Sequence, residues 1–126
     1  MQVIKNFVPF KEYQKMKEVI WSNNFSWYFN ETTLKDIPSE PQFIHIFYSE
    51  NAPASPFIRV IDPFISAIKP LSIFRIKINL NYRTEKIIET GMHFDLEDKK
   101  KRFNSAVFFF NECNGYCRVG DEKIYS

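Results

Sequence analysis

The sequence predicts an α+β fold in which helices come first and antiparallel strands joined by short turns follow, as in a β-sandwich or jelly roll. Apolar residues recur at helical spacing in the first part of the chain. Beyond Pro70, short alternating or β-branched segments are separated by turn residues. With 126 residues, 17% of them aromatic, the chain is large enough for one core. We therefore expect a single domain over residues 1–126.

Two helices are expected, and they should pack on the sheet. The first spans about 9–24, where apolar side chains recur three or four positions apart behind an opening proline. The second spans 55–68, because Ser55 followed by proline is an N-cap and first-turn signature. Pro63 lies inside this second helix and removes an amide donor. We therefore expect a restart there, with Asp62 as the cap of the second part.

The remaining segments are predicted as strands or loops from their alternation and turn residues. The expected strands are a short one around 25–29, the apolar segment 43–48, and then 72–82, 86–94, 105–111, 116–119 and a last one beginning at Lys123. Loops are expected at 32–41 and 51–55.

The dipeptide Asn114-Gly115 predicts a two-residue hairpin turn. In that hairpin Cys113 faces Tyr116 and Cys117 faces Glu112, and neighbouring cross-strand pairs point to opposite sides of a sheet. A disulfide is therefore not expected. A zinc half-site is the sharper alternative, but a closed site needs four ligands and no second pair is spaced to supply them. We expect two reduced structural thiols.

Charge and hydropathy narrow the class of partner. The net charge of +2 is small and scattered, so nucleic-acid binding is not indicated, and the basic run 99–102 is interpreted as a solvated loop. No apolar run approaches the ~18 to 20 residues of a membrane span. The N-terminus lacks the apolar centre of a signal peptide. The sequence predicts a cytoplasmic protein with no membrane partner.

His93 and Asp95 are the candidate metal ligands. Residues at i and i+2 point to the same side of an extended strand, so an imidazole and a carboxylate there can bind one cation. A facial triad of two imidazoles and one carboxylate suits non-heme Fe(II), but no histidine follows position 93. His45 precedes the motif, and we expect it to be a core or rim histidine with one hydrogen-bond partner.

A strand with strict alternation precedes this motif. Arg75, Lys77 and Asn79 fall on one face, and isoleucine and leucine side chains fall on the other. One interpretation is a surface strand with its polar side in water. The other is a polar barrel interior, in which these cationic and amide groups bind a dicarboxylic cosubstrate beside the metal.

The stretch RIKINLNYRTEKIIETGMHFD, followed by SAVFFFNECNGY, resembles the middle of the Fe(II)- and 2-oxoglutarate-dependent dioxygenases. The likeness is to a prolyl-4-hydroxylase-like group common in phage and marine bacterial genomes. The shared pattern is a strand with Arg-x-Lys-x-Asn, then His-x-Asp, then an apolar strand ending in Asn, then Asn-Gly-Tyr. The resemblance covers about 75–119 and is faint upstream.

The resemblance implies a double-stranded β-helix, or jelly roll, with His93 and Asp95 as iron ligands and 2-oxoglutarate as cosubstrate. Family members hydroxylate a substrate while decarboxylating 2-oxoglutarate, and the substrate here is a small molecule, a nucleobase or a peptide side chain. They continue to a second histidine and then to a basic residue that binds the cosubstrate. Neither follows here, and Cys117, Arg118 and Gly120 also depart from the family pattern. We therefore expect a domain incomplete at its C-terminus and inactive by itself.

Two other interpretations remain open. One is a non-catalytic jelly-roll module for binding or virion assembly, in which His93 and Asp95 are structural. The other is a gene fragment without independent function. If late strands are missing, the apolar segment 108–110 or its neighbour lies at an unpaired sheet edge, through which the chain would oligomerise.

Overall fold

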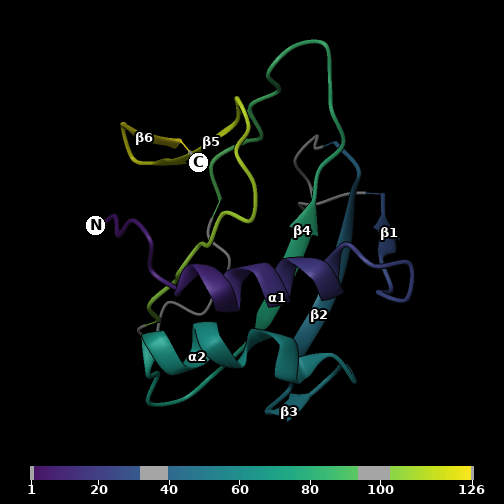
Figure 1. Ribbon diagram of the computed structural model, residues 1–126. Coiled ribbons are helices and arrows are strands. Elements are labelled where there is room, and N and C mark those ends of the chain that lie inside the picture. The colour runs from purple at the N-terminus through teal and green to yellow at the C-terminus, as the bar shows by residue number, and fades with distance from the viewer. Residues whose placement is uncertain (1, 32–39, 94–102, 126) are drawn as a thin grey trace. The chain divides into compact units, whose positions relative to one another are not determined.

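The computed structural model describes residues 2–31, 40–93 and 103–125, which form an α+β structure with two α-helices and antiparallel sheets (Figure 1). This confirms the predicted class. In the described residues the sheets do not close into a barrel. The chain divides into two compact units. Of the described residues, 2–31 and 41–81 belong to the first unit, and 40, 82–93 and 103–125 belong to the second.

Helix α1 (Phe10–Ile20) begins directly after Pro9, as its periodicity predicts. Met16 and Ile20 are its buried residues, and their four-residue spacing places them on one face of the helix. The helix ends earlier than the predicted 24. Its last carbonyls are satisfied locally, because the Ser22 hydroxyl donates to the Val19 carbonyl over 2.7 Å.

The second helical segment restarts at its proline, as predicted. A short 3₁₀ helix η1 (Ile58–Ile61) leads into α2 (Asp62–Ile68), with Pro63 in the first turn. The expected capping role of Asp62 is wrong: Asp62 is the first helical residue, and its carboxylate pairs with Arg59 at 3.3 Å. Neither α1 nor α2, the two α-helices in the described ranges, is long and apolar enough to cross a membrane.

The first unit contains a four-stranded antiparallel sheet built around one long central strand. Its strands are β1 (Tyr28–Asn30), β2 (Gln42–Ser49), β3 (Ala52–Pro53) and β4 (Ile76–Leu80). Strand β2 pairs with β4 along one edge, and with β1 and β3 at opposite ends of the other edge. The predicted strand 43–48 is confirmed, whereas 25–29 and 72–82 are only partly strand.

The turn between β2 and β3 uses left-handed backbone. Glu50 and Asn51 have φ of 51° and 61°. A two-residue hairpin of type I′ requires positive φ at both central positions, and asparagine adopts it with little strain. The predicted connection at 51–55 therefore begins as a tight hairpin that directs the chain back along β2 towards Ser55.

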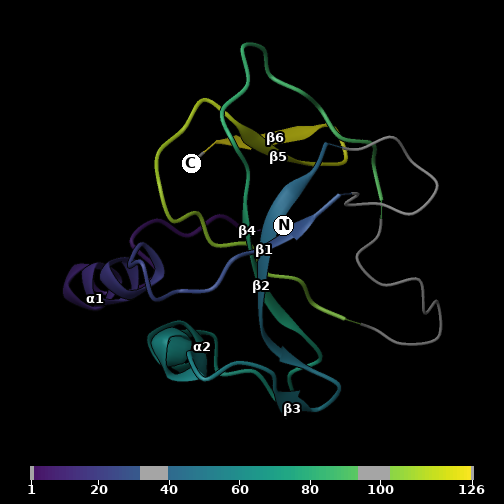
Figure 2. The ribbon, with the colours of Figure 1, turned by 90° about the vertical axis from the view of Figure 1, so that its right-hand side faces the viewer.

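Both helices of the first unit lie on the same face of its sheet (Figures 1 and 2). The core lies between the two helices and this face of the sheet. Its buried apolar residues, among those described, are Val8, Met16, Ile20, Phe25, Phe47 and Ile61. Phe47 on β2 is 1% exposed, and its ring lies 5.9 Å from that of Phe25. Aromatic packing between the sheet and the loop after α1 therefore anchors this unit.

The register of β2 and β4 assigns side chains to the two faces. His45 lies opposite Ile78, and directly opposed residues in an antiparallel pair share a face. Lys77 and Asn79 alternate with Ile78 and so point to the other face. These two polar residues therefore lie on the sheet face that the helices do not cover.

The second unit contains the hairpin of β5 (Tyr116–Val119) and β6 (Glu122–Tyr125). The predicted hairpin at 114–115 is wrong. Gly120, with φ of 60°, occupies the first position of the two-residue turn, and only glycine adopts this conformation freely. Cys117 therefore lies opposite Ile124, and only in this register do the Tyr116 and Tyr125 rings meet, at 5.5 Å.

Two further predicted strands are not found. The described parts of 86–94 and all of 105–111 are not in strands. Alternation of side chains reports an extended backbone, but a strand also needs a partner to complete its ladder. Rings two residues apart still share a side in this region, since Phe108 and Phe110 meet edge to face at 5.1 Å.

A polar cluster joins the segment 82–93 to the hairpin. The Tyr116 hydroxyl donates to Glu89 over 2.6 Å, Arg118 pairs with the same carboxylate, and Lys123 donates to the Tyr116 oxygen over 3.0 Å. The Tyr116 hydrogen bond, followed by the charges of Arg118 and Lys123, lowers the pKa of Glu89. The hydrogen bond to Tyr116 raises the pKa of Lys123. These contacts therefore favour the charged form of Glu89, which lies in the same segment as His93.

Phe47→Ala should destabilise the chain by about 3 to 5 kcal/mol, because it leaves a cavity in a packed aromatic core. Phe10→Ala is the matched control, since Phe10 is 71% exposed on α1, and its effect should stay within about 0.5 kcal/mol. The measurement is urea unfolding followed by circular dichroism. Equal losses for the two variants would contradict the assigned core.

Tyr116→Phe should raise the pKa of Glu89 towards that of an ordinary glutamate, because the largest cause of its depression is removed. A depressed carboxyl pKa contributes stability that is lost as pH falls through the folded pKa, so the variant should lose this contribution at higher pH than the wild type. The measurement is a carbon NMR titration of the Glu89 carboxyl. Tyr82→Phe, which removes a hydroxyl bonded to Glu40, should leave the Glu89 titration unchanged.

Candidate functional site

The predicted metal pair is only partly within the described residues. His93 lies in the second unit and is exposed. Asp95 lies outside the described residues, so the expected common orientation of the two side chains stays a prediction. Within the described ranges, no group of three His, Cys, Asp or Glu side chains is close enough to bind a metal together.

The ring of His93 has a defined hydrogen bond to the backbone. Its Nδ1 lies 3.0 Å from the Gly91 carbonyl oxygen. A carbonyl only accepts, so the proton is on Nδ1 and Nε2 carries the lone pair of the neutral ring. Metal-binding histidines commonly donate their second ring N–H to a backbone carbonyl in this way. The contact with Gly91 is of this kind, and the role of His93 as a metal ligand stays a prediction.

The predicted cosubstrate residues lie on or beside β4 of the first unit. Arg75 directly precedes the strand, Lys77 and Asn79 are within it, and all three are exposed. The predicted alternation is confirmed for the strand, whose isoleucine and leucine side chains are half-buried. His93 belongs to the second unit, so a cavity shared by these residues and His93 stays a prediction.

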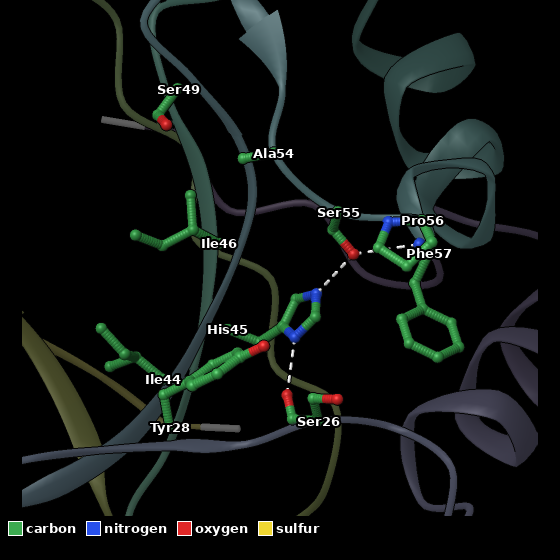
Figure 3. A pocket seen from close by; sticks show the side chains of 10 residues that line it. All are labelled: Ser26, Tyr28, Ile44, His45, Ile46, Ser49, Ala54, Ser55, Pro56 and Phe57. Carbon is green, nitrogen blue, oxygen red and sulfur yellow. Dashed lines mark hydrogen bonds between the residues drawn. The ribbon is translucent and has the colours of Figure 1, made fainter.

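A pocket of about 360 Å³ lies in the first unit, beside the stretch of β2 between its pairings with β1 and β3 (Figure 3). The lining residues are Ser26, Tyr28, Ile44, His45, Ile46, Ser49, Ala54, Ser55, Pro56 and Phe57. In the figure the imidazole of His45 points towards Ser55, whereas Ile44 and Ile46 point away from it. The polar chemistry of this pocket therefore centres on His45 and Ser55.

His45 is 3% exposed, and both of its ring nitrogens have partners. Nδ1 lies 2.6 Å from the Ser26 carbonyl oxygen, and Nε2 lies 2.7 Å from the Ser55 hydroxyl oxygen. The carbonyl accepts, so Nδ1 carries the proton. In the neutral ring Nε2 then accepts, and the Ser55 hydroxyl donates to it. The expected core histidine is confirmed, with two partners instead of one.

Ser55 sits between the histidine and a helix start. Ser55 is 8% exposed, and its side-chain oxygen also accepts the backbone N–H of Phe57 over 2.9 Å. The sequence predicts Ser55 as a helix N-cap, and this is wrong: η1 begins at Ile58, its cap position is Phe57, and no side chain caps it. The contact two residues along the chain instead holds the turn that precedes η1. The same hydroxyl therefore accepts one hydrogen bond from the turn and donates another to His45.

Aromatic rings surround the imidazole. The ring centroids of Phe25, Phe47, Phe57 and Tyr28 lie 4.3, 4.8, 6.0 and 6.2 Å from that of His45. These rings keep water from most of the imidazole surface. Its two hydrogen bonds are therefore made in a largely apolar setting, where such bonds are stronger than in water.

Sequence reasoning places His45 and Ser55 in separate elements and does not join them. The available signals are a histidine inside an apolar strand and a serine-proline helix start ten positions later. What joins them is the Glu50-Asn51 turn, which reverses the chain after β2 and brings Ser55 back beside it. A two-residue turn midway between a strand histidine and a serine ten positions later is the sequence pattern that could have indicated the contact of His45 with Ser55.

No family model, curated protein or solved structure matches this chain.

Proposed function

We propose that the chain is an Fe(II)- and 2-oxoglutarate-dependent oxygenase-like domain of the double-stranded β-helix type. The single observation that carries the proposal is the position of Lys77 and Asn79. They lie on one face of an antiparallel sheet whose opposite face carries the helices. The sequence resemblance over 75–119 supplies the rest of the argument.

The two faces of the sheet have different roles in such a fold. In a jelly roll a second sheet packs on the face away from the covering helices, and in this structure Lys77 and Asn79 are exposed on that face. Lys77 and Asn79 on that face, with Arg75 at the strand start, are suited to a dianionic cosubstrate. A cationic side chain and an amide bind carboxylate oxygens by charge-assisted and neutral hydrogen bonds.

The metal ligands in this proposal are His93 and Asp95. The imidazole has its second nitrogen on the Gly91 carbonyl, and a carboxylate with an imidazole is a donor set that suits Fe(II). His45 does not serve as the second imidazole, because Ser26 and Ser55 occupy both of its nitrogens. Within these 126 residues the triad therefore has two members.

Iron(II) with 2-oxoglutarate supplies oxidation by O₂, with release of succinate and CO₂. The contribution of this chain is binding and orientation. His93 and Asp95 hold the cation, and Lys77 and Asn79 hold the carboxylate groups of the cosubstrate. With two protein ligands, metal binding is weak, and we expect no appreciable decarboxylation of 2-oxoglutarate by this chain alone.

His93→Ala should abolish the binding of Mn(II), an air-stable substitute for Fe(II), because one ligand of a two-ligand site leaves too little to hold a divalent cation. Water-proton relaxation or electron paramagnetic resonance measures the bound fraction. Asp95→Asn should have the same effect through loss of the carboxylate charge. His45→Gln is the matched control, since His45 has no role in this site.

Unchanged Mn(II) binding in His93→Ala would contradict the proposed metal site. No binding by the wild-type chain at millimolar metal would do the same, and it would favour the non-catalytic binding module. Circular dichroism of each variant separates loss of the site from loss of the fold.

Lys77→Ala should weaken 2-oxoglutarate binding about tenfold or more, because a charge-assisted hydrogen bond contributes roughly 1.5 to 3 kcal/mol. Calorimetry in the presence of Mn(II) is the measurement. Lys15→Ala is the control, because Lys15 is an exposed lysine on α1, paired with Glu12, and the net charge changes equally. Equal weakening in the two variants would show a general charge effect and would contradict a bound carboxylate at Lys77.

A further inference from the structure

We propose that Ser55 and His45 form a nucleophile and general-base pair, and that their pocket is an acyl-transfer site for small apolar esters. This activity is separate from the proposed oxygenase function. It uses none of the residues assigned there, and the pocket lies wholly within the first unit.

The contacts of the imidazole match those of a catalytic base. A nucleophile is activated when its hydroxyl donates to a neutral imidazole whose other nitrogen is oriented by a third group. Ser55 Oγ lies 2.7 Å from Nε2, and the Ser26 carbonyl oxygen lies 2.6 Å from Nδ1. The carbonyl fixes the tautomer in which Nε2 is the base and stabilises the imidazolium that forms on proton transfer.

The Ser55 oxygen is also placed for attack. It lies in the pocket wall, and the N–H of Phe57 donates to it over 2.9 Å. Hydrogen bonds to the charged form of a group favour that form. The Phe57 N–H therefore stabilises negative charge as it develops on Oγ while the Oγ proton moves to His45.

The reaction has two steps, formation of an acyl-serine and its hydrolysis. Ser55 Oγ bonds to the ester carbonyl carbon while its proton moves to His45 Nε2. The C–O bond to the alcohol then breaks, and the alcohol leaves with that proton. Water attacks the acyl-serine, His45 takes the water proton and returns it to Oγ, and a carboxylic acid leaves. No oxidant or metal is consumed.

The lining indicates the class of substrate. Tyr28, Ala54, Pro56 and Phe57 give the pocket an apolar wall, and about 360 Å³ is near the small end of ligand pockets. Among the described lining residues no side chain carries a full charge when His45 is neutral. A short neutral acyl group therefore fits better than a charged one.

The same contacts would also serve as a purely structural link between three segments. Chemical reactivity separates the two roles, because a serine that only holds a turn does not react with a serine-directed electrophile. Incubation of the full chain with a small alkyl fluorophosphonate tests this. Intact mass and peptide mapping then report the adduct.

We expect one phosphonyl group per chain, located on Ser55, and slow release of 4-nitrophenol from 4-nitrophenyl acetate. Ser55→Ala should lose both signals. Ser66→Ala, which removes an exposed serine of α2 that does not line the pocket, should keep both. Wild-type chain unfolded in urea should not be labelled, because reactivity depends on the folded pair.

Absence of an adduct in the folded wild type would overturn the proposal without reference to any variant. Equal labelling of the folded and unfolded chain, or an adduct on a residue other than Ser55, would also overturn it. These results come from the wild-type chain, so the test remains decisive even if Ser55→Ala fails to fold.

Discussion

The buried imidazole of His45 is the constraint on which the first unit depends. A polar group in an apolar core costs roughly 1 to 3 kcal/mol if it lacks a partner, so both ring nitrogens must be satisfied. The partners are the Ser26 carbonyl and the Ser55 hydroxyl, at sequence separations of 19 and 10. The loop after α1 and the turn before η1 are therefore held against β2 by a single side chain.

The sheet of the first unit separates two kinds of chemistry. Its helix-covered face carries the aromatic core and His45, and its other face carries Lys77 and Asn79. The period of two along β4 makes this separation unavoidable, because neighbouring residues cannot share a face. The proposed acyl-transfer pair and the residues of the proposed oxygenase site therefore share no side chains, and each proposal can be tested by substitutions that spare the other.

The second unit is stabilised differently. All fully buried apolar side chains among the described residues belong to the first unit. A two-stranded hairpin has little stability alone, so contacts around Glu89, Tyr116 and Arg118 matter more here. Exposed ion pairs are weak individually, and shared partners make this set more persistent than a single pair. Through Glu89, this cluster connects the hairpin to the segment that also contains His93.

The sequence by itself determined the elements that local physics controls: the helix after Pro9, the restart at Pro63, the strand around His45 and the alternation of β4. The helix and its restart follow from residue period and proline geometry, which need no distant partner. The period of the two strand segments predicts an extended backbone, which their pairing with each other completes. Only the tertiary structure decided that Gly120, and not Gly115, makes the hairpin turn, since both dipeptides suit a turn and the cross-strand ring contact of Tyr116 selects one. It likewise decided that Ser55 meets His45, because pairing across a chain reversal depends on register, which side-chain period does not encode.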